Sequence, residues 1–366
     1  MSGLRDEVQQ FKAVDQHAHP VLKAESELPF AAAFTEATDP AIWERDTPHV
    51  LFYRRSVKQL AKLYRCAARD VEVLTVRKRL DLTARTALCL QESHLKTLLL
   101  DDGMMADDSM PLDWHRQFVP VKRLLRIEHL VESLLAAHES FEEFDQAFTE
   151  RLQNLTEEEV GLKSIAAYRG GLDVPDTTRS KAAKEFARAR GKAGVYASPF
   201  YSYVFHHALE IAHESGVPVQ FHTGFGDPDL ALEKANPLLL RPVIERYSFP
   251  VVLLHAGYPF TRETGFLSSV YSNVWVDFGL ALPFLSVAGM RSCLRQLVEL
   301  TPLNKLLYSS DASLIPELYY LGSINGRAIL ADVLEECVKE GDLDAGEAIE
   351  AARWILAENA ERLYSL

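Results

Sequence analysis

Two histidines separated by one residue, His17 and His19, lie near the end of a short apolar segment. Successive side chains of a strand point to opposite faces, so these two imidazoles share one face and can reach one ion. Pro20 follows directly and ends a strand, because it has no N–H to donate to the ladder. The spacing therefore predicts a pair of metal ligands at the carboxyl end of a strand.

Four further ionisable side chains lie in later apolar segments or at their ends. They are Lys163, His222, His255 and Asp311. Neutral imidazoles and a carboxylate suit zinc or a related divalent ion, with positions left open for water. Each histidine alone could be a hydrogen-bonded core residue, and the aspartate alone could be a helix cap. Together with the first pair, they predict a metal centre.

Eight short apolar segments alternate with helical patterns along the chain. They span residues 13–18, 96–102, 121–128, 160–168, 218–224, 250–257, 274–279 and 305–311. This alternation predicts an α/β fold, a (β/α)8 TIM barrel, in preference to an open doubly wound sheet. In a barrel, the carboxyl ends of the strands meet on one face, so the six candidate ligands would converge there.

The connection between the first and second segments, residues 21–95, is far longer than an ordinary barrel loop. A stretch of this length should form structure of its own, and it contains helical patterns. We interpret it as a helical cap insertion over the barrel mouth, within a single domain of residues 1–366. A separate small domain on the barrel flank is the alternative.

The composition favours a globular enzyme acting on a small molecule. Among 366 residues, 48% are hydrophobic, and the formal net charge of -13 argues against nucleic acid or an anionic membrane as partner. The four cysteines form no Cys-x-x-Cys pair, and the polar amino terminus lacks the apolar stretch of a signal peptide. We expect a cytoplasmic protein with a small-molecule substrate; homo-oligomer formation stays open.

The order of His-x-His, Lys, His, His and Asp over nearly the whole chain resembles the amidohydrolase superfamily, of the amidohydrolase 2 type. Several stretches are also similar to the amidohydrolase domain that precedes glutamine synthetase in FluG-like and nodulin-type fusion proteins. These stretches are residues 14–20, 161–169, 221–227, 254–259 and 308–311. The superfamily match is specific, and the subfamily match is looser.

The resemblance implies one or two divalent ions, with Zn²⁺ expected first and Mn²⁺ or Fe²⁺ as alternatives. His17 and His19 would hold the more buried ion, with Asp311 as a further ligand. His222 and His255 would bind the second ion. In a single-metal enzyme, His222 would be a ligand and His255 would orient the water.

The resemblance also implies a carboxylated Lys163 that bridges two ions, since a protonated ammonium has no lone pair to offer a metal. An unmodified lysine paired with a substrate anion or a nearby acid is the alternative. The implied reaction is hydrolysis of an amide C–N bond by metal-activated water. Asp311 would take the proton of the water and deliver it to the leaving amine, and His255 would assist.

Substrate contacts are predicted from charged residues near two strand ends. Arg126 and Glu128 close the third segment, and Tyr168 and Arg169 close the fourth or follow it. An arginine fork would hold a substrate carboxylate, and Glu128 would receive an ammonium, which suits an amino-acid end such as a γ-glutamyl group. A structural Arg126–Glu128 pair at the rim is the alternative. Asp227 is a further candidate for lining the pocket.

Three other functions fit the same residues. A single-metal decarboxylase (a lyase) would leave Lys163 unmodified. A sugar-acid isomerase would use the metal and Asp311 to move protons. A metal-stabilised binding domain is disfavoured, because ligands at a barrel mouth leave open positions that suit chemistry.

Overall fold

Eight parallel strands pair in chain order in the computed structural model, which describes residues 2–24, 28–190, 196 and 198–366. They are β1 (Ala13–Ala18), β2 (Leu95–Asp101), β3 (Val121–Arg126), β4 (Glu159–Ser164), β5 (Val219–Phe221), β6 (Val251–Leu253), β7 (Val274–Asp277) and β8 (Leu306–Leu307). Gln16 N–H donates to the Tyr308 carbonyl (3.3 Å) and Asp311 N–H donates to the His17 carbonyl (3.0 Å), so the chain after β8 closes against β1. The predicted (β/α)8 barrel is confirmed.

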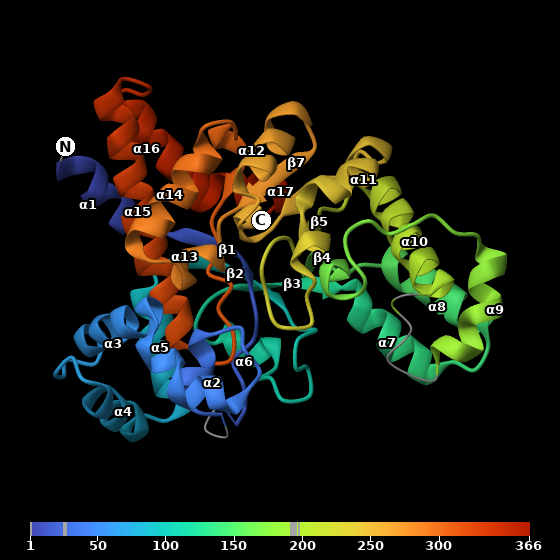
Figure 1. Ribbon diagram of the computed structural model, residues 1–366, viewed down its shortest axis with the longest axis horizontal. Helices are drawn as coiled ribbons and strands as arrows, with labels where there is room; N and C mark the ends of the chain where they lie inside the picture. Colours follow the sequence, from blue (N-terminus) through green and yellow to red (C-terminus); the bar gives the residue numbers. More distant parts are fainter. Residues whose placement is uncertain (1, 25–27, 191–195, 197) are drawn as a thin grey trace.

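Helices surround these strands (Figure 1). They are α1 (Ser2–Gln10), α2 (Pro40–Arg45), α3 (Leu51–Leu63), α4 (Asp70–Arg79), α5 (Leu82–Glu92), α6 (Leu112–Arg116), α7 (Ile127–Ala137), α8 (Phe141–Gln153), α9 (Arg179–Ala189), α10 (Pro199–Ser215), α11 (Arg241–Arg246), α12 (Thr261–Val270), α13 (Ala281–Phe284), α14 (Val287–Val298), α15 (Glu317–Glu340), α16 (Ala345–Arg353) and α17 (Asn359–Tyr364). Figure 1 shows α2 to α5 gathered at one corner of the molecule and α8 to α10 at the opposite end.

The inside of the barrel is filled by inward-facing aliphatic side chains. Val14, Leu99, Leu124 and Leu307 belong to one buried cluster with residues of the carboxyl-terminal helix α17. Strands covered on both sides are expected to be apolar throughout, as these are. Tyr364 of α17 reaches into this layer, where its hydroxyl donates to Gln16 Oε1 (2.8 Å). The barrel is therefore a packed core, and a cavity opens beyond the carboxyl ends of the strands.

Several strands are shorter than the apolar segments that predict them. β5 and β6 have three residues each and β8 has two. His222, His255 and Asp311 consequently lie after their strands, on backbone that has left the sheet ladder. Outside the ladder, the backbone at His255 and Asp311 adopts positive φ angles.

The segment between β1 and β2 folds into helices that pack on the barrel. The Phe52 ring lies 5.0 Å from that of Phe284 in α13, and the Arg55 guanidinium donates to the carbonyls of Leu285 (3.0 Å) and Pro283 (2.5 Å). Phe52 shares one hydrophobic cluster with the strand residue Val276. We therefore retain, as a proposal, residues 21–95 as a cap insertion of a single domain 1–366.

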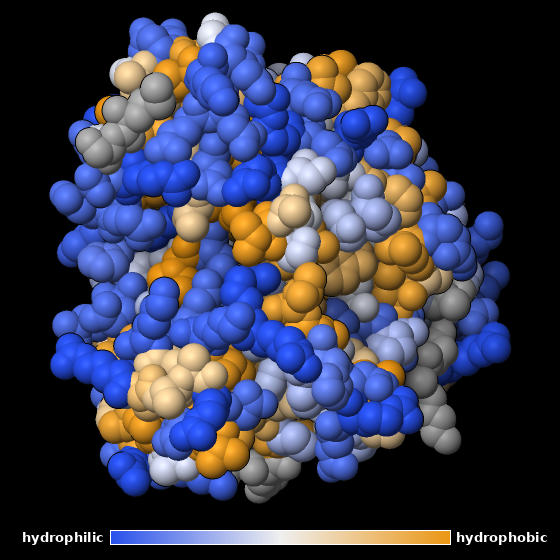
Figure 2. Space-filling view, turned by 60° about the vertical axis from the view of Figure 1, so that its left-hand side comes forward, coloured by the Kyte–Doolittle hydropathy of each residue, from blue (hydrophilic) through white to orange (hydrophobic). Residues whose placement is uncertain are grey.

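The surface is mostly hydrophilic, with hydrophobic side chains in separate patches, on the face that Figure 2 shows. Scattered exposed apolar residues of this kind are normal for a globular protein. Within the described part of the chain, no helix combines the length and the apolar character that crossing a bilayer requires. All four cysteines are free thiols.

Candidate metal centre

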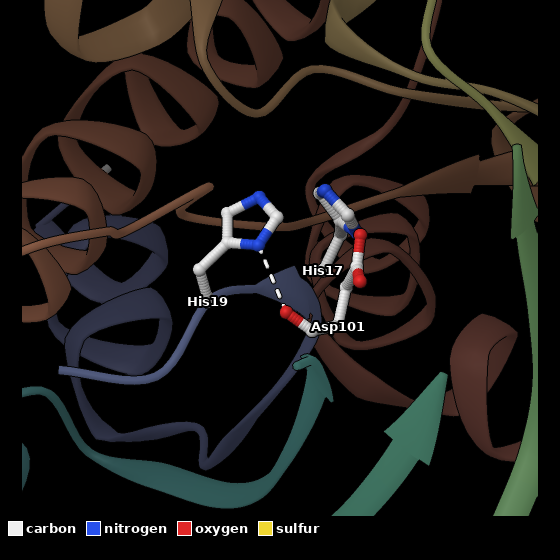
Figure 3. Close-up of side chains that lie close together, drawn as sticks. All are labelled: His17, His19 and Asp101. Atoms are coloured by element: carbon white, nitrogen blue, oxygen red, sulfur yellow. Dashed lines mark hydrogen bonds between the residues drawn. The ribbon is translucent and has the colours of Figure 1, made fainter. Parts of the chain in front are cut away.

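The two histidines of the His-x-His motif meet the aspartate that follows β8. His17 Nε2 lies 3.2 Å from Asp311 Oδ1, and His19 Nε2 lies 3.5 Å from the same oxygen. His19 Nδ1 lies 3.0 Å from the Asp101 carbonyl oxygen, the contact dashed in Figure 3. A proton on Nδ1 that is donated to this carbonyl leaves the Nε2 lone pair free for a cation.

His255 approaches Asp311 from β6, with its Nδ1 3.9 Å from Asp311 Oδ2. Both residues have left-handed backbone, with φ of 65° for His255 and 49° for Asp311. Such strain in non-glycine residues persists only where the surrounding structure holds it, and it is concentrated at functional sites. Here His255 N–H donates to Asp277 Oδ1 (2.7 Å), while Asp311 N–H donates to the His17 carbonyl (3.0 Å).

The donor set fits a divalent cation. One ligand atom each from His17, His255 and Asp311 lies within 4.8 Å of the other two. His17 Nδ1, His255 Nδ1 and Asp311 Oδ1 are buried and make no hydrogen bond with any described residue. Buried polar atoms are nearly always bonded, so unbonded atoms on two imidazoles and one carboxylate are consistent with a place for an ion. His17 faces Asp311 through Nε2, which also contacts Lys163.

A second candidate group, His17, His19 and Asp101, shares both histidines of the motif (Figure 3). Both oxygens of the Asp101 carboxylate already accept hydrogen bonds from Arg126, at 2.6 to 3.0 Å. Burial alone would raise the pKa of Asp101, but the charges of Arg126, His19 and Lys163 and the hydrogen bonds from Arg126 together outweigh burial and hold the pKa below its usual range. Asp311 is therefore the better ligand, and Asp101 orients His19 through its carbonyl.

The ionisation states suit metal binding. Burial lowers the pKa of His17 to about 4, and it lowers the pKa values of His222 and His255 well below the ordinary value. All three imidazoles are therefore neutral near pH 7, which is the form that ligates metals. Burial opposes ionisation of Asp311, but the facing histidines, His255 first, hold its pKa well below the usual range.

Lys163 lies at this centre, as the sequence predicts. It is buried, and its Nζ is 3.0 Å from His17 Nε2. Burial lowers the pKa of Lys163 to about 8, while the nearby carboxylate of Asp101 opposes the shift. A lower pKa increases the fraction of free amine, the form that can react with carbon dioxide. Carboxylation of Lys163 remains a prediction.

His222 is brought to the same cavity but is held differently. Its ring lies 4.5 Å from the rings of both His255 and Tyr168. Its Nε2 lies 3.1 Å from the Phe225 carbonyl oxygen, so a proton there leaves Nδ1 as the ligating atom. Among the described residues, His222 joins neither of the two ligand groups described above.

Three of the four predicted substrate contacts line the cavity. Tyr168 and Arg169 line the cavity at the strand ends, and the Arg169 guanidinium lies 4.7 Å from the centre of the Tyr196 ring. Arg126 also reaches this cavity, but its bonds to Asp101 neutralise it, so the expected free arginine fork is not available.

Glu128 requires a correction, because it is not among the residues that line the cavity. It belongs to α7, where the chain has turned away from the barrel mouth. Its Oε1 accepts hydrogen bonds from Ser164 Oγ and Tyr201 OH, each at 2.8 Å. The alternative Arg126–Glu128 rim pair is not formed either, since Arg126 pairs with Asp101.

The cavity has a volume of about 580 Å³ and also contains groups that the sequence did not single out. Glu36 and Trp43 of the segment after β1 line it, together with Asp227, which was a candidate. No periodicity or motif marks Glu36, because its place depends on how residues 28–52 fold back over the mouth. Asp101 and Asp277 were missed because their roles are to bond other site residues.

Comparisons with known proteins relate the chain to one family. A family profile described as Amidohydrolase matches residues 14–366. Protein fluG of Emericella nidulans is 32% identical over 410 residues and matches 100% of this chain, which spans 47% of the length of that relative.

Two solved structures resemble the whole chain. A Lactobacillus casei protein, provisionally described as a metal-dependent hydrolase, has a TM-score of 0.88 at 27% identity, covering 99% of this chain and 97% of its own. A uronate isomerase of Thermotoga maritima has a TM-score of 0.68 at 14% identity, covering 99% and 96% of the two chains. At that identity the isomerase indicates a shared fold alone.

Proposed function

This chain belongs to the amidohydrolase family, and from that premise we propose that it hydrolyses an amide C–N bond of a small molecule, with a γ-glutamyl amide as the substrate to test first. The observation that carries the proposal is the convergence of His17, His19, His255 and Asp311 at one end of the barrel, with buried donor atoms left unbonded. A site of this kind leaves space on its open side for a carbonyl group and water.

We assign the ligands as the sequence predicts. His17 and His19 would hold the more buried ion with Asp311, while His222 and His255 would hold a second ion or orient water. Lys163 would bridge the two ions once carboxylated. A bound divalent ion, Zn²⁺ or alternatively Mn²⁺ or Fe²⁺, supplies Lewis acidity that polarises the carbonyl and acidifies water.

The residues of the chain account for proton transfer. Asp311 is ionised at neutral pH, so its carboxylate can accept the proton of the attacking water. The same group can then protonate the leaving nitrogen, which departs as a neutral amine. His255, 3.9 Å from Asp311, would assist by orienting the water.

Arg169 and Tyr168 are the substrate-binding residues that we retain. A guanidinium without an acidic partner among the described residues is suited to a substrate carboxylate. The Tyr168 hydroxyl is close to the backbone of Gly226, where any Cβ would lie 1.9 Å from it, so this ring is tightly fixed beside His222. A γ-glutamyl group carries a suitable carboxylate.

A second candidate is a single-metal enzyme on the same barrel, either a decarboxylase or a sugar-acid isomerase. The contact between Lys163 Nζ and His17 Nε2 favours it, because an unmodified lysine that donates to this nitrogen would compete with an ion for the same lone pair. Intact mass and metal content per chain separate the candidates. Two ions and a carbon-dioxide adduct support the binuclear hydrolase, whereas one ion and an unmodified lysine favour the single-metal enzyme.

The direct test of the reaction is release of amine from a panel of γ-glutamyl amides, measured with the metal-loaded protein. We expect turnover that chelation removes and added metal restores. Absence of turnover on every amide, together with decarboxylation or isomerisation of a carboxylic or sugar acid, would contradict the proposed reaction. We further propose that the protein acts in the cytoplasm without a nucleic-acid partner, which its acidic composition supports.

A further inference from the structure

Glu36 presents a carboxyl group to the metal cavity from the segment that follows the short 3-10 helix η2 (Phe30–Phe34). Unlike Asp101, whose oxygens are bonded by Arg126, Glu36 makes no hydrogen bond or ion pair with any described residue. A partly buried carboxyl group without a partner is costly to ionise, so such a group is retained where something else supplies the partner.

The backbone around Glu36 is fixed in place. The Trp43 indole N–H donates to the Ala37 carbonyl (2.5 Å), and Ala37 N–H donates to Thr35 Oγ1 (3.1 Å). On the other side, the Phe34 ring packs 5.1 Å from that of Phe52. Glu36 is therefore held by its neighbours at the cavity wall and differs from a surface acid that is free to turn into solvent.

The charges near Glu36 are negative. Burial first, and then the carboxylates of Asp311 and Asp227, raise the pKa of Glu36 to about 8. A cation placed beside Glu36 would stabilise its ionised carboxylate and so offset both the burial and the nearby negative charges. Arg169, which lines the cavity and forms no ion pair with a described residue, lies over Tyr196, and its charge acts on Asp227. The cavity thus contains a carboxyl group from the insertion, which a bound cation would ionise, and a guanidinium from the loop after β4 that forms no ion pair with a described residue.

We propose that Glu36 binds the ammonium group of the substrate while Arg169 binds its carboxylate, so that the enzyme selects substrates with a free α-amino-acid end. This inference rests on the proposed function and specifies its substrate class. It makes Glu36 a specificity-determining residue that the insertion contributes to the barrel. Removing the charge of Glu36 should weaken recognition of the ammonium and leave the rest of the site intact.

Binding of L-glutamate and of glutarate, which lacks the amino group, tests this inference without turnover. Calorimetry on the metal-loaded protein should show about tenfold tighter binding of L-glutamate, the ratio that 1.4 kcal/mol gives. Glu36→Gln should abolish this preference, and Glu36→Asp should keep part of it. Glu44→Gln removes an exposed carboxylate from the same insertion and should leave the preference unchanged. Thermal unfolding checks that each variant is folded.

Equal affinities for the two acids in the natural protein, or an unchanged preference in Glu36→Gln, would overturn the inference. Glu36→Gln could instead lower kcat equally on γ-glutamyl and glutaryl amides while keeping the binding preference for L-glutamate. That result would also overturn the inference and place Glu36 in the chemical step. A preserved glutamate preference without hydrolysis of any γ-glutamyl amide would support the role of Glu36 and reject the proposed reaction.

Discussion

The strand ends and the insertion face each other across one cavity, but they hold their charged groups differently. At the strand ends, the ionised carboxylates contact other site residues: Asp311 lies against His17, and Asp101 is bonded to Arg126. On the insertion, Glu36 has no partner among the described residues. We propose from this contrast that the barrel fixes the chemistry before substrate arrives, whereas the insertion leaves a carboxyl group available for recognition. The predictions below test that division.

Removal of a ligand at the strand ends should have the largest effect. Asp311→Asn or His17→Ala should reduce turnover by at least about 10³-fold, as expected when a group that stabilises the transition state is lost. Both variants should still fold, because the apolar barrel core does not depend on these side chains. Steady-state rates and circular dichroism are the measurements. A folded variant that retained activity would remove Asp311 or His17 from the mechanism.

The paired arginine at the strand ends should matter most for stability. Arg126→Met leaves Asp101 buried without its partner, which should lower the free energy of unfolding by about 3–5 kcal/mol. Urea denaturation measures this change. Arg169→Met is the matched control and should change stability by less than about 1 kcal/mol, since it breaks no buried ion pair. Similar losses in the two variants would erase the distinction between paired and unpaired arginines.

The unpaired arginine should matter for substrate binding. Arg169→Met should raise KM for a γ-glutamyl amide by about tenfold or more, the effect expected for loss of a charged hydrogen bond to a carboxylate. The kcat should change little, because the metal ligands remain in place. An unchanged KM, measured by initial rates, would show that the substrate carboxylate is bound elsewhere.

A pH dependence of stability is expected beside the His-x-His motif, away from the catalytic groups. Burial lowers the pKa of His115 to about 4, and its Nε2 accepts a hydrogen bond from Val21 N–H (3.1 Å). Between the unfolded value of about 6.5 and pH 4, the unfolded chain binds the proton and the folded chain does not. The contribution of His115 to the free energy of unfolding is therefore fully present above pH 6.5. It falls on acidification by up to about 1.4 kcal/mol per pH unit.

His115→Gln should flatten the loss of stability between pH 6.5 and 4, relative to the natural protein and to His138→Gln. Thermal unfolding at a series of pH values measures the slopes. Identical slopes in the three proteins would mean that His115 is not the group that takes up the proton.

The sequence predicts the barrel, and it predicts which ionisable side chains meet at its mouth, because both depend on local patterns. Apolar segments ending in ionisable residues identify strand ends, and a parallel barrel must bring those ends to one face. Pairings across strands are not local. Arg126 meets Asp101 only through the register of β2 on β3, which sets Asp101 opposite Leu124. The sequence therefore offered Arg126 as a free substrate ligand, although it is already bonded.

Glu128 and Glu36 show two other limits of predicting a site from the sequence. Two positions after a strand end, Glu128 already belongs to a helix that has turned away, and sequence spacing does not reveal that turn. Glu36 lies in an insertion without periodicity, so only the folded structure brings it to the cavity. Recognition groups carried by insertions are thus the part of such a site that is hardest to predict.

Metal content of the purified protein is the most direct test of the central claim, that strand-end side chains from β1, β6 and β8 form one metal centre. After saturation with Zn²⁺ and removal of excess ion, the natural protein should retain at least about one equivalent per chain. His17→Ala and His255→Ala should each retain less, while Glu36→Gln should retain the natural amount. Natural levels of bound metal in a folded His17→Ala variant would contradict the account.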